Sequence, residues 1–145
     1  MKNQYNLNCN IAQTLNIIGD KWSLLILHEI KKGHKTFKEI EDNLQGIPTN
    51  LLSSRLKNLE EDELIKSQLY QKHPPRYEYV LTESGSDLED IFNSLIMWGE
   101  KHLHKCYKRL VHKKCESKVE HQYYCPTCDS VVSKNEIGVK PMEDK

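Results

Sequence analysis

The sequence lacks any long apolar run. It has no stretch of 18 consecutive apolar residues, and its first ten residues, MKNQYNLNCN, contain neither an apolar core nor a small-residue cleavage site. A membrane-spanning helix needs about 20 mostly apolar residues, and a secretory signal needs an apolar core followed by such a site. We therefore expect a cytoplasmic protein with no membrane partner.

The chain also has no net charge. The chain has 21 basic and 21 acidic residues, so the overall positive charge of many nucleic-acid-binding proteins is missing. Acids are missing locally as well, because none occurs between Asp42 and Glu60 or between Glu63 and Glu78, whereas basic residues occur in both stretches. One such stretch alone is usually a solvated surface. Whether it faces a nucleic acid depends on the helix or strand in which it lies.

Cysteines are few, and their odd number, five, does not suit a framework of disulfides. In a reducing compartment such cysteines more often bind metal or carry out redox chemistry. Three of them, with two of the seven histidines, fall in HKKCESKVEHQYYCPTCD, residues 112–129. The 145 residues suit one domain of about 100–200 residues with a small appendage, and this cluster lies in the appendage.

Apolar residues at helical spacing predict helices up to residue 62. Two helices are separated by a Gly-Asp pair, and a third follows Thr36, which has Glu39 at the spacing of a capping box. The turn QGIPTN leads to a fourth helix over about residues 50–62, with Thr49 as its expected N-cap. This helix turns leucines inward and a small, polar and basic set outward: Asn50, Ser53, Ser54 and Lys57.

The next segment, LIKSQLYQKHPPRYEYVLT, predicts a β-hairpin with His73 to Arg76 at its tip. After Thr82, a predicted cap, apolar residues recur up to Leu103 on a long amphipathic helix with a wide apolar stripe. A helix, a short turn, a polar-faced helix and a basic hairpin follow one another in a winged helix-turn-helix. The two acid-free stretches coincide with the polar-faced helix and the basic hairpin. Because carboxylates would repel phosphates, this coincidence favours a surface that faces DNA phosphates. The expected fold class is α+β and mainly helical.

Longer motifs carry a resemblance to a known family. The strings LNIIGDKWSLLILHEIKKGHKTFKEIEDNLQGIPTNLLSSRLKNLEEDELI, HPPRYEYVLTESGSDL and MWGEKHL resemble the HxlR-type winged helix-turn-helix transcriptional regulators over about residues 9–104. The chain differs from the family pattern at Asn10, usually Pro, and at Pro48, usually Ser. The matching positions are Cys9, Ile18, Gly19, Lys21, Trp22, Phe37, Glu39, Ile40, Gly46, Ile47, Leu52, Leu56, Leu59, Glu60, Pro75, Tyr79, Leu81, Thr82, Gly85 and Trp98.

The resemblance implies a homodimeric, sequence-specific DNA-binding regulator, usually a repressor, whose first helix and long last helix form the dimer contact. Such a dimer would bind a pseudo-palindromic operator with half-sites about 34–36 Å, or a multiple, apart. Arg55 is assigned either to the DNA backbone or to helix packing. The residues expected at the DNA are Thr49, Asn50, Ser53, Ser54, Arg55 and Lys57 of the fourth helix and Lys72, His73 and Arg76 of the wing.

In several family members the cysteine that matches Cys9 senses oxidants or electrophiles. A position at a helix N-terminus can make a thiol reactive, although Cys9 could equally be a half-buried residue at the helix start. The expected signal is therefore oxidative or electrophile stress, or a small ligand, and the sequence does not identify the inducer.

The tail contains two pairs with zinc-ligand spacing, His112-x-x-Cys115 and Cys125-x-x-Cys128. Two such pairs supply the four N/S ligands of a tetrahedral zinc site. Four protein ligands leave no position for a reacting water, so we expect one structural Zn²⁺ per chain in a small zinc-ribbon-like tail. A similar tail occurs in some HxlR-type proteins.

Three alternatives to this structural zinc site stay open. Cys106 or His121 could replace His112 as the fourth ligand. Cys125 and Cys128 could be a redox dithiol, and zinc-bound thiolates could themselves be an oxidant sensor. The resulting division is a DNA-binding and dimerisation domain over residues 1–104, a zinc-binding extension over 105–135 and a flexible tail over 136–145.

We expect no enzymatic activity. The alternatives to a DNA-binding regulator are a small thiol oxidoreductase that uses the CxxC pair and an adaptor that binds other proteins. Turnover of a disulfide substrate would indicate the first. Weak, salt-independent DNA association would indicate the second, because phosphate contacts make affinity fall with salt.

Overall fold

The computed structural model describes residues 4–142. The chain forms two compact units that divide after Phe92. The functional division predicted at residue 104 stays a prediction, as does the flexible tail over 136–145, of which residues 143–145 lie outside the described part. None of the helices in residues 4–142 is both long enough and apolar enough to cross a membrane.

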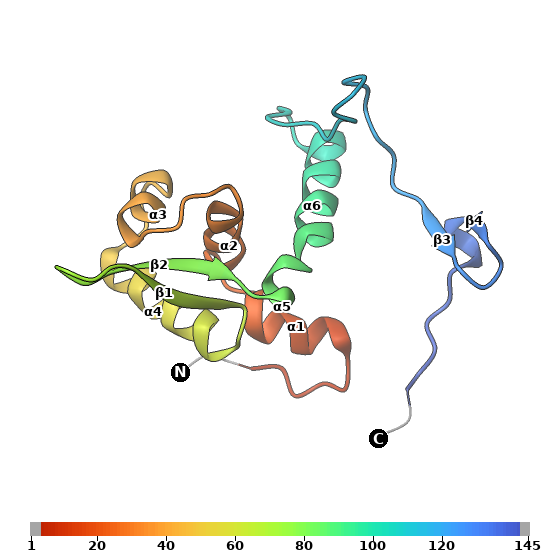
Figure 1. Cartoon of the computed structure of the whole chain (residues 1–145). Helices are drawn as coiled ribbons and strands as arrows, with labels where there is room; N and C mark the ends of the chain where they lie inside the picture. The colour runs from red at the N-terminus through yellow and green to blue at the C-terminus, as the bar shows by residue number, and fades with distance from the viewer. Residues whose placement is uncertain (1–3, 143–145) are drawn as a thin grey trace. The chain divides into compact units, whose positions relative to one another are not determined.

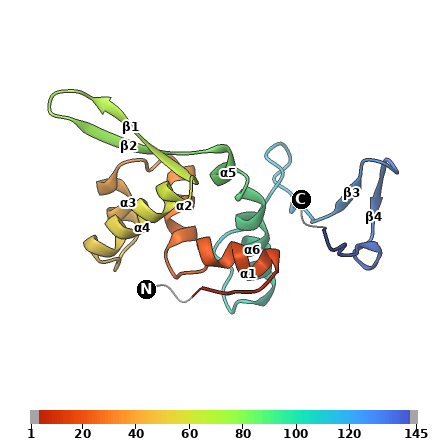
Figure 2. The same cartoon turned by 90° about the horizontal axis from the view of Figure 1, so that it is seen from below.

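The first unit is a winged helix-turn-helix, as predicted (Figures 1 and 2). Its two strands form one antiparallel sheet, in which Ile65 pairs with Leu81 and Gln71 with Arg76. The elements are α1 (Asn10–Ile18), α2 (Ser23–Lys31), α3 (Phe37–Asn43), α4 (Thr49–Glu61), β1 (Ile65–Gln71), β2 (Arg76–Leu81), α5 (Glu83–Ser86) and the start of α6 (Glu89–His102).

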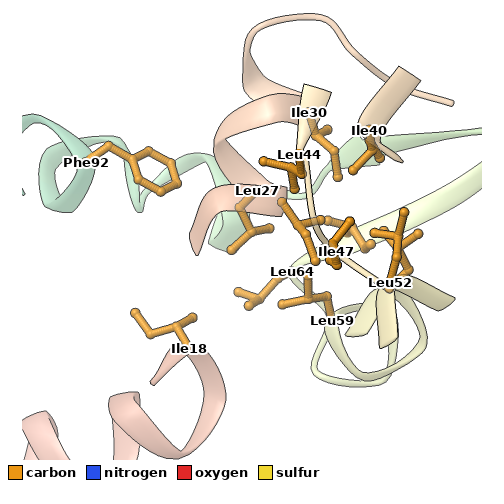
Figure 3. Close-up of a cluster of buried hydrophobic side chains, with 13 residues drawn as sticks. Ile18, Leu27, Ile30, Ile40, Leu44, Ile47, Leu52, Leu59, Leu64 and Phe92 are labelled. Carbon is orange, nitrogen blue, oxygen red and sulfur yellow. The ribbon is translucent and has the colours of Figure 1, made fainter. Parts of the chain in front are cut away.

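A single hydrophobic core holds the first unit together (Figure 3). The predicted inward face of α4 is confirmed, because Leu52, Leu56 and Leu59 have exposed fractions of 0%, 2% and 1%. They pack with apolar side chains of α2 and α3 and of the first residue of β1. Burying a Leu or Ile side chain contributes about 1.5–3 kcal/mol each, so this core fixes α4 against the other helices.

The junction of α1 and α2 depends on a glycine and a carboxylate. A Cβ atom at Gly19 would lie 2.3 Å from the carbonyl oxygen of Leu15, so only glycine fits this close approach. Asp20 Oδ2 then accepts hydrogen bonds from the backbone N–H groups of Trp22 and Ser23, both at 3.1 Å. These bonds satisfy donors at the start of α2 that have no partner within the helix.

Thr36 is the N-cap of α3, as predicted, but its capping box is only half formed, and the predicted cap of α4 is wrong. Thr36 Oγ1 accepts the N–H of Glu39 at 3.2 Å, while the Glu39 carboxylate accepts the N–H of Lys35 instead of that of Thr36. The prediction that Thr49 caps α4 is wrong, because Pro48 is the N-cap and Thr49 is the first helical residue. Pro48 adopts the extended backbone of an N-cap (φ −63°, ψ 138°) without offering a side-chain acceptor.

The predicted long helix after the wing is two helices, α5 and α6, separated by Asp87 and Leu88. Thr82 is confirmed as a cap, since its Oγ1 accepts the N–H of Gly85 at 3.2 Å. A Cβ atom at Gly85 would meet the carbonyl oxygen of Leu64 at 2.2 Å. The absence of a side chain there lets α5 lie directly against the backbone just before β1.

The second unit contains the remainder of α6 and the cysteine-rich tail. A small antiparallel hairpin is formed by β3 (Tyr123–Cys125) and β4 (Ser130–Val132), in which Cys125 pairs with Ser130. A 3₁₀ helix, η1 (Lys134–Glu136), follows. The Cys125-x-x-Cys128 pair therefore lies at the turn of this hairpin.

Candidate nucleic-acid interface

The outward face of α4 has the predicted composition. Asn50, Ser53, Ser54 and Lys57 are exposed. Within residues 4–142 none of these four side chains forms a hydrogen bond or an ion pair. Their donors and acceptors are therefore available to base edges and phosphates.

Thr49, at the start of the same face, is already bonded within the chain. Its hydroxyl donates to Glu41 Oε2 at 2.7 Å. Glu41 lies in α3 and just outside the acid-free stretch, so the sequence pattern missed it as a neighbour of α4. A carboxylate at this point restrains Thr49 and opposes close approach of a phosphate.

Arg55 points toward the protein and not toward solvent. Its Nε donates to Asp20 Oδ2 at 2.9 Å, and the two side chains are only 20% and 17% exposed. Burial raises the pKa of Asp20, but hydrogen bonds from Ser23 and Trp22 and the charge of Arg55 outweigh it and hold the pKa below its usual value. Of the two roles assigned to Arg55, this geometry favours helix packing, because the ion pair ties α4 to the α1–α2 junction.

The wing projects beyond the helices of the first unit (Figures 1 and 2). Lys72, His73 and Arg76 are exposed at its tip, where Gln71 Nε2 donates to the carbonyl oxygen of His73 at 3.2 Å. The base of the wing is anchored by the N–H of Tyr79, which donates to the carbonyl oxygen of Lys35 at 2.7 Å. The tip thus presents basic side chains from a strand pair that is fixed at its other end.

Two helices expose apolar side chains that the core of the first unit does not use. On α1, Ile11 is 71% exposed and Leu15 is 42% exposed. On α6, Leu95 is 53% exposed and Trp98 is 61% exposed. Apolar stripes of this kind on neighbouring turns of a helix are typical of helices that pack against a partner.

Cys9 is exposed and occupies the N-cap position of α1, without a side-chain cap bond. The segment before it is fastened to α1 by amide side chains. Asn16 accepts the N–H of Tyr5 at 2.8 Å and donates to its carbonyl oxygen at 3.0 Å, while Gln13 donates to the carbonyl oxygen of Leu7 at 2.9 Å. The Cys9 thiol is therefore accessible on a backbone that is held in place.

The side chains of the first predicted pair, His112 and Cys115, lie close together. His112 Nδ1 lies 3.4 Å from Cys115 Sγ, and the turn closes through Glu116, whose N–H donates to the carbonyl oxygen of His112 at 2.7 Å. Hydrogen bonds from the backbone N–H and the hydroxyl of Ser117 lower the pKa of the Cys115 thiol. This favours the thiolate, which is the form that binds metal.

The second pair, Cys125 and Cys128, has a matching turn. The N–H of Cys128 donates to Cys125 Sγ at 3.5 Å. Hydrogen bonds from the N–H and thiol of Cys128 and from the N–H of Thr127 lower the pKa of the Cys125 thiol. Each pair is followed by a residue in the left-handed region, Glu116 (φ 57°) or Asp129 (φ 50°).

The residues of each pair thus suit a metal, but the pairs lie apart. Across residues 4–142, no three His, Cys, Asp or Glu side chains gather closely enough to hold one ion. The alternative ligands are engaged in other contacts: Cys106 Sγ donates to the carbonyl oxygen of Lys108 at 3.4 Å, and the ring of His121 lies 5.4 Å from that of Tyr123. The four-ligand zinc site stays a prediction.

Comparisons with known proteins agree with this geometry. Residues 17–107 match the model of the HxlR-like helix-turn-helix family. The HTH-type transcriptional regulator YdeP of Bacillus subtilis (strain 168) is 35% identical over 111 residues, which are 77% of this chain and 87% of that protein.

Solved structures agree as well. A crystal structure of PA1607, a candidate transcription factor, has a TM-score of 0.77 at 27% identity and covers 93% of this chain and 96% of that one. The redox regulator HypR in its oxidized form has a TM-score of 0.59 at 36% identity and covers 67% of this chain and 100% of that one. The sequence matches are to transcriptional regulators and not to enzymes, and the chain belongs to the HxlR-like helix-turn-helix family of transcriptional regulators.

Proposed function

We propose that the chain is a cytoplasmic, homodimeric repressor that binds a pseudo-palindromic DNA operator through α4 and the wing. The observation that carries this proposal is the exposed, unpaired polar and basic face of α4 in a fold that places a basic wing tip on the same unit. In a winged helix-turn-helix the second helix of the pair enters the major groove and the wing touches the backbone. We assign base-edge and phosphate contacts to Asn50, Ser53, Ser54, Lys57, Lys72, His73 and Arg76, with Thr49 and Arg55 supporting α4.

A fluorescence-anisotropy titration against DNA from upstream of the chain's own gene tests this proposal. We expect tight binding that weakens steeply with salt, because each phosphate contact contributes about −0.9 to the slope of log K against log salt. K57Q should weaken binding and flatten this slope. K38Q is the matched control, since Lys38 is an exposed lysine of α3 paired with Asp42 at 3.2 Å. Weak, salt-independent binding would instead indicate a protein-binding adaptor.

We propose further that oxidation of a thiol controls DNA binding. The exposed position of Cys9 at the start of α1 supports this, as does the similarity to HypR, which is itself a redox regulator. If oxidant abolishes binding, reductant restores it and C9S no longer responds, Cys9 carries the signal. If C9S responds like the unchanged chain, the tail thiols carry it. Equal binding in both redox states would contradict redox control and favour a small ligand as inducer.

The tail is proposed to bind one Zn²⁺ per chain through His112, Cys115, Cys125 and Cys128. Both turns already hold a pair of donors, and Zn²⁺ would draw the pairs together and stabilise the tail, because binding energy of this kind becomes folding energy. Metal analysis should give about one zinc per chain, and C128S should lower it. C106S is the matched control and should leave the zinc content unchanged. A metal-free preparation with a fully folded tail would contradict this proposal.

A further inference from the structure

The segment that follows most of α6 carries a concentration of positive charge that the proposed operator contacts do not use. Residues 101–118, KHLHKCYKRLVHKKCESK, have seven basic residues and one acid, so this segment carries +6. Because the chain is neutral overall, the remainder carries −6. The basic residues are Lys101, Lys105, Lys108, Arg109, Lys113, Lys114 and Lys118.

The acid just before this basic segment, Glu100, is paired within the protein, whereas Glu116, the one acid inside the segment, is exposed. The Glu100 carboxylate accepts from Arg109 Nε at 2.6 Å and lies 3.4 Å from Lys118 Nζ, and its side chain is only 8% exposed. Arg109 and Lys118 are therefore partly used within the protein. The other five lysines are exposed, and Lys105 Nζ lies 5.2 Å from the centre of the Tyr107 ring, itself 75% exposed.

Two of these lysines are held at the end of a closed turn. Val111 and Lys118 form an antiparallel bridge, and the N–H of His112 donates to the carbonyl oxygen of Ser117 at 2.9 Å. Between them, Lys113 and Lys114 occupy the two positions enclosed by His112 and Cys115. A preformed turn loses little backbone entropy when its tip binds a partner, which distinguishes this tip from a run of lysines on a flexible chain.

We infer that the basic segment 101–118, with Lys113 and Lys114 at its tip, is a second DNA-binding surface that contacts duplex phosphates in addition to the contacts of α4 and the wing. This inference rests on the proposed function. Duplex DNA is the polyanion that a regulator of this family meets, and it carries one negative charge per roughly 1.7 Å of helix axis. Five exposed lysines outnumber the one exposed carboxylate of the segment, Glu116, and such lysines suit phosphate contacts, which add affinity without reading sequence.

The test compares two double variants of the full, zinc-supplied chain. K113Q/K114Q removes the two charges at the tip, and K134Q/K140Q removes two exposed charges elsewhere in the tail. The probe is a duplex of about 40 bp, long enough for two half-sites and flanking DNA, chosen from upstream of the chain's own gene by footprinting. Anisotropy is measured over a range of salt concentrations, and circular dichroism and zinc content show whether each variant folds like the unchanged chain.

K113Q/K114Q removes four lysines from the proposed dimer, so we expect the salt slope to fall by about 3.6 and the dissociation constant at about 0.1 M salt to rise on the order of 4,000-fold. The control should stay within about twofold. If K57Q weakens binding but K113Q/K114Q matches its control, the proposed operator contacts stand and this inference fails. If the unchanged chain shows no salt-dependent binding, both fail. Loss of binding to phosphatidylserine vesicles in K113Q/K114Q, with unchanged DNA slopes, would also overturn the inference and assign the segment to an anionic membrane surface.

Discussion

At the scale of single residues, Asp20 joins two parts of the first unit. Its carboxylate satisfies the start of α2 through Trp22 and Ser23 and accepts the guanidinium of Arg55 from α4. Helical spacing in the sequence correctly predicted the outward residues of α4, because that pattern is local. It could not reveal the Asp20–Arg55 pair or the Thr49–Glu41 bond, since these depend on how separate helices pack.

We expect D20N to lower the free energy of unfolding by roughly 1–3 kcal/mol at pH 7, because it weakens a helix cap and leaves Arg55 without its charged partner. D42N is the control: Asp42 is an exposed partner of Lys38, and its loss should change stability by less than about 0.5 kcal/mol. Urea unfolding followed by circular dichroism measures both. Equal stabilities for the two variants would show that the Asp20 contacts contribute little.

The pH dependence of the D20N effect follows from the pKa of Asp20, which is lower in the folded protein than its usual value. A carboxylate with a depressed folded pKa contributes stability above its unfolded pKa of about 3.9, and this contribution is lost as pH falls through the folded pKa. The stability difference between D20N and the unchanged chain should therefore be full at pH 7 and shrink below about pH 4. A difference that is constant down to pH 3 would exclude Asp20 ionisation as its cause.

At the scale of elements, α4 is the helix on which DNA binding is proposed to depend, yet its N-cap, Pro48, offers no side-chain acceptor. From the sequence, Pro48 replaces the serine usual in the family, and the N-cap was predicted at Thr49, one residue too late. The extended backbone that proline favours is compatible with the N-cap position itself, so the helix begins directly after it. The break between α5 and α6 was missed for a different reason, because apolar spacing continued across it.

A serine at position 48 should restore the missing cap. P48S and P48A lose the same conformational restriction of the unfolded chain, but only serine supplies an oxygen for a backbone N–H of the first turn. We expect P48S to be more stable than P48A by about 1 kcal/mol, measured as the difference in free energy of urea unfolding. If the two variants unfold alike, the start of α4 is satisfied without a side-chain cap.

At the scale of the whole molecule, the sequence predicted the family fold and the order of its elements, because winged helix-turn-helix motifs depend on local spacing and turn residues. The sequence also located both donor pairs in the tail. It could not predict how these pairs lie relative to each other, since few apolar residues fix the tail and a metal ion would supply the missing constraint. Dimerisation is likewise indicated only by exposed apolar side chains on α1 and α6.

Trp98 offers the sharpest test of dimerisation. It is 61% exposed on α6, and large aromatic residues of this kind are frequent hot spots of interfaces. We expect W98E to raise the dimer dissociation constant by at least about 30-fold, equivalent to about 2 kcal/mol, and to weaken operator binding with it. V139E is the control, because Val139 is 98% exposed and lies outside both helices. Sedimentation velocity reports the mass, and an unchanged dimer in W98E would contradict this interface.

The uneven distribution of charge also affects how the protein behaves in solution. The chain has no net charge at neutral pH, with a calculated isoelectric point of about 7.0, yet the basic segment carries +6 and the remainder −6. Molecules of zero net charge do not repel one another, and opposite charges on separate regions attract neighbouring copies. The purified protein should therefore be least soluble near pH 7 in dilute buffer and should redissolve at about 0.15 M salt, where charges more than about 8 Å apart are screened.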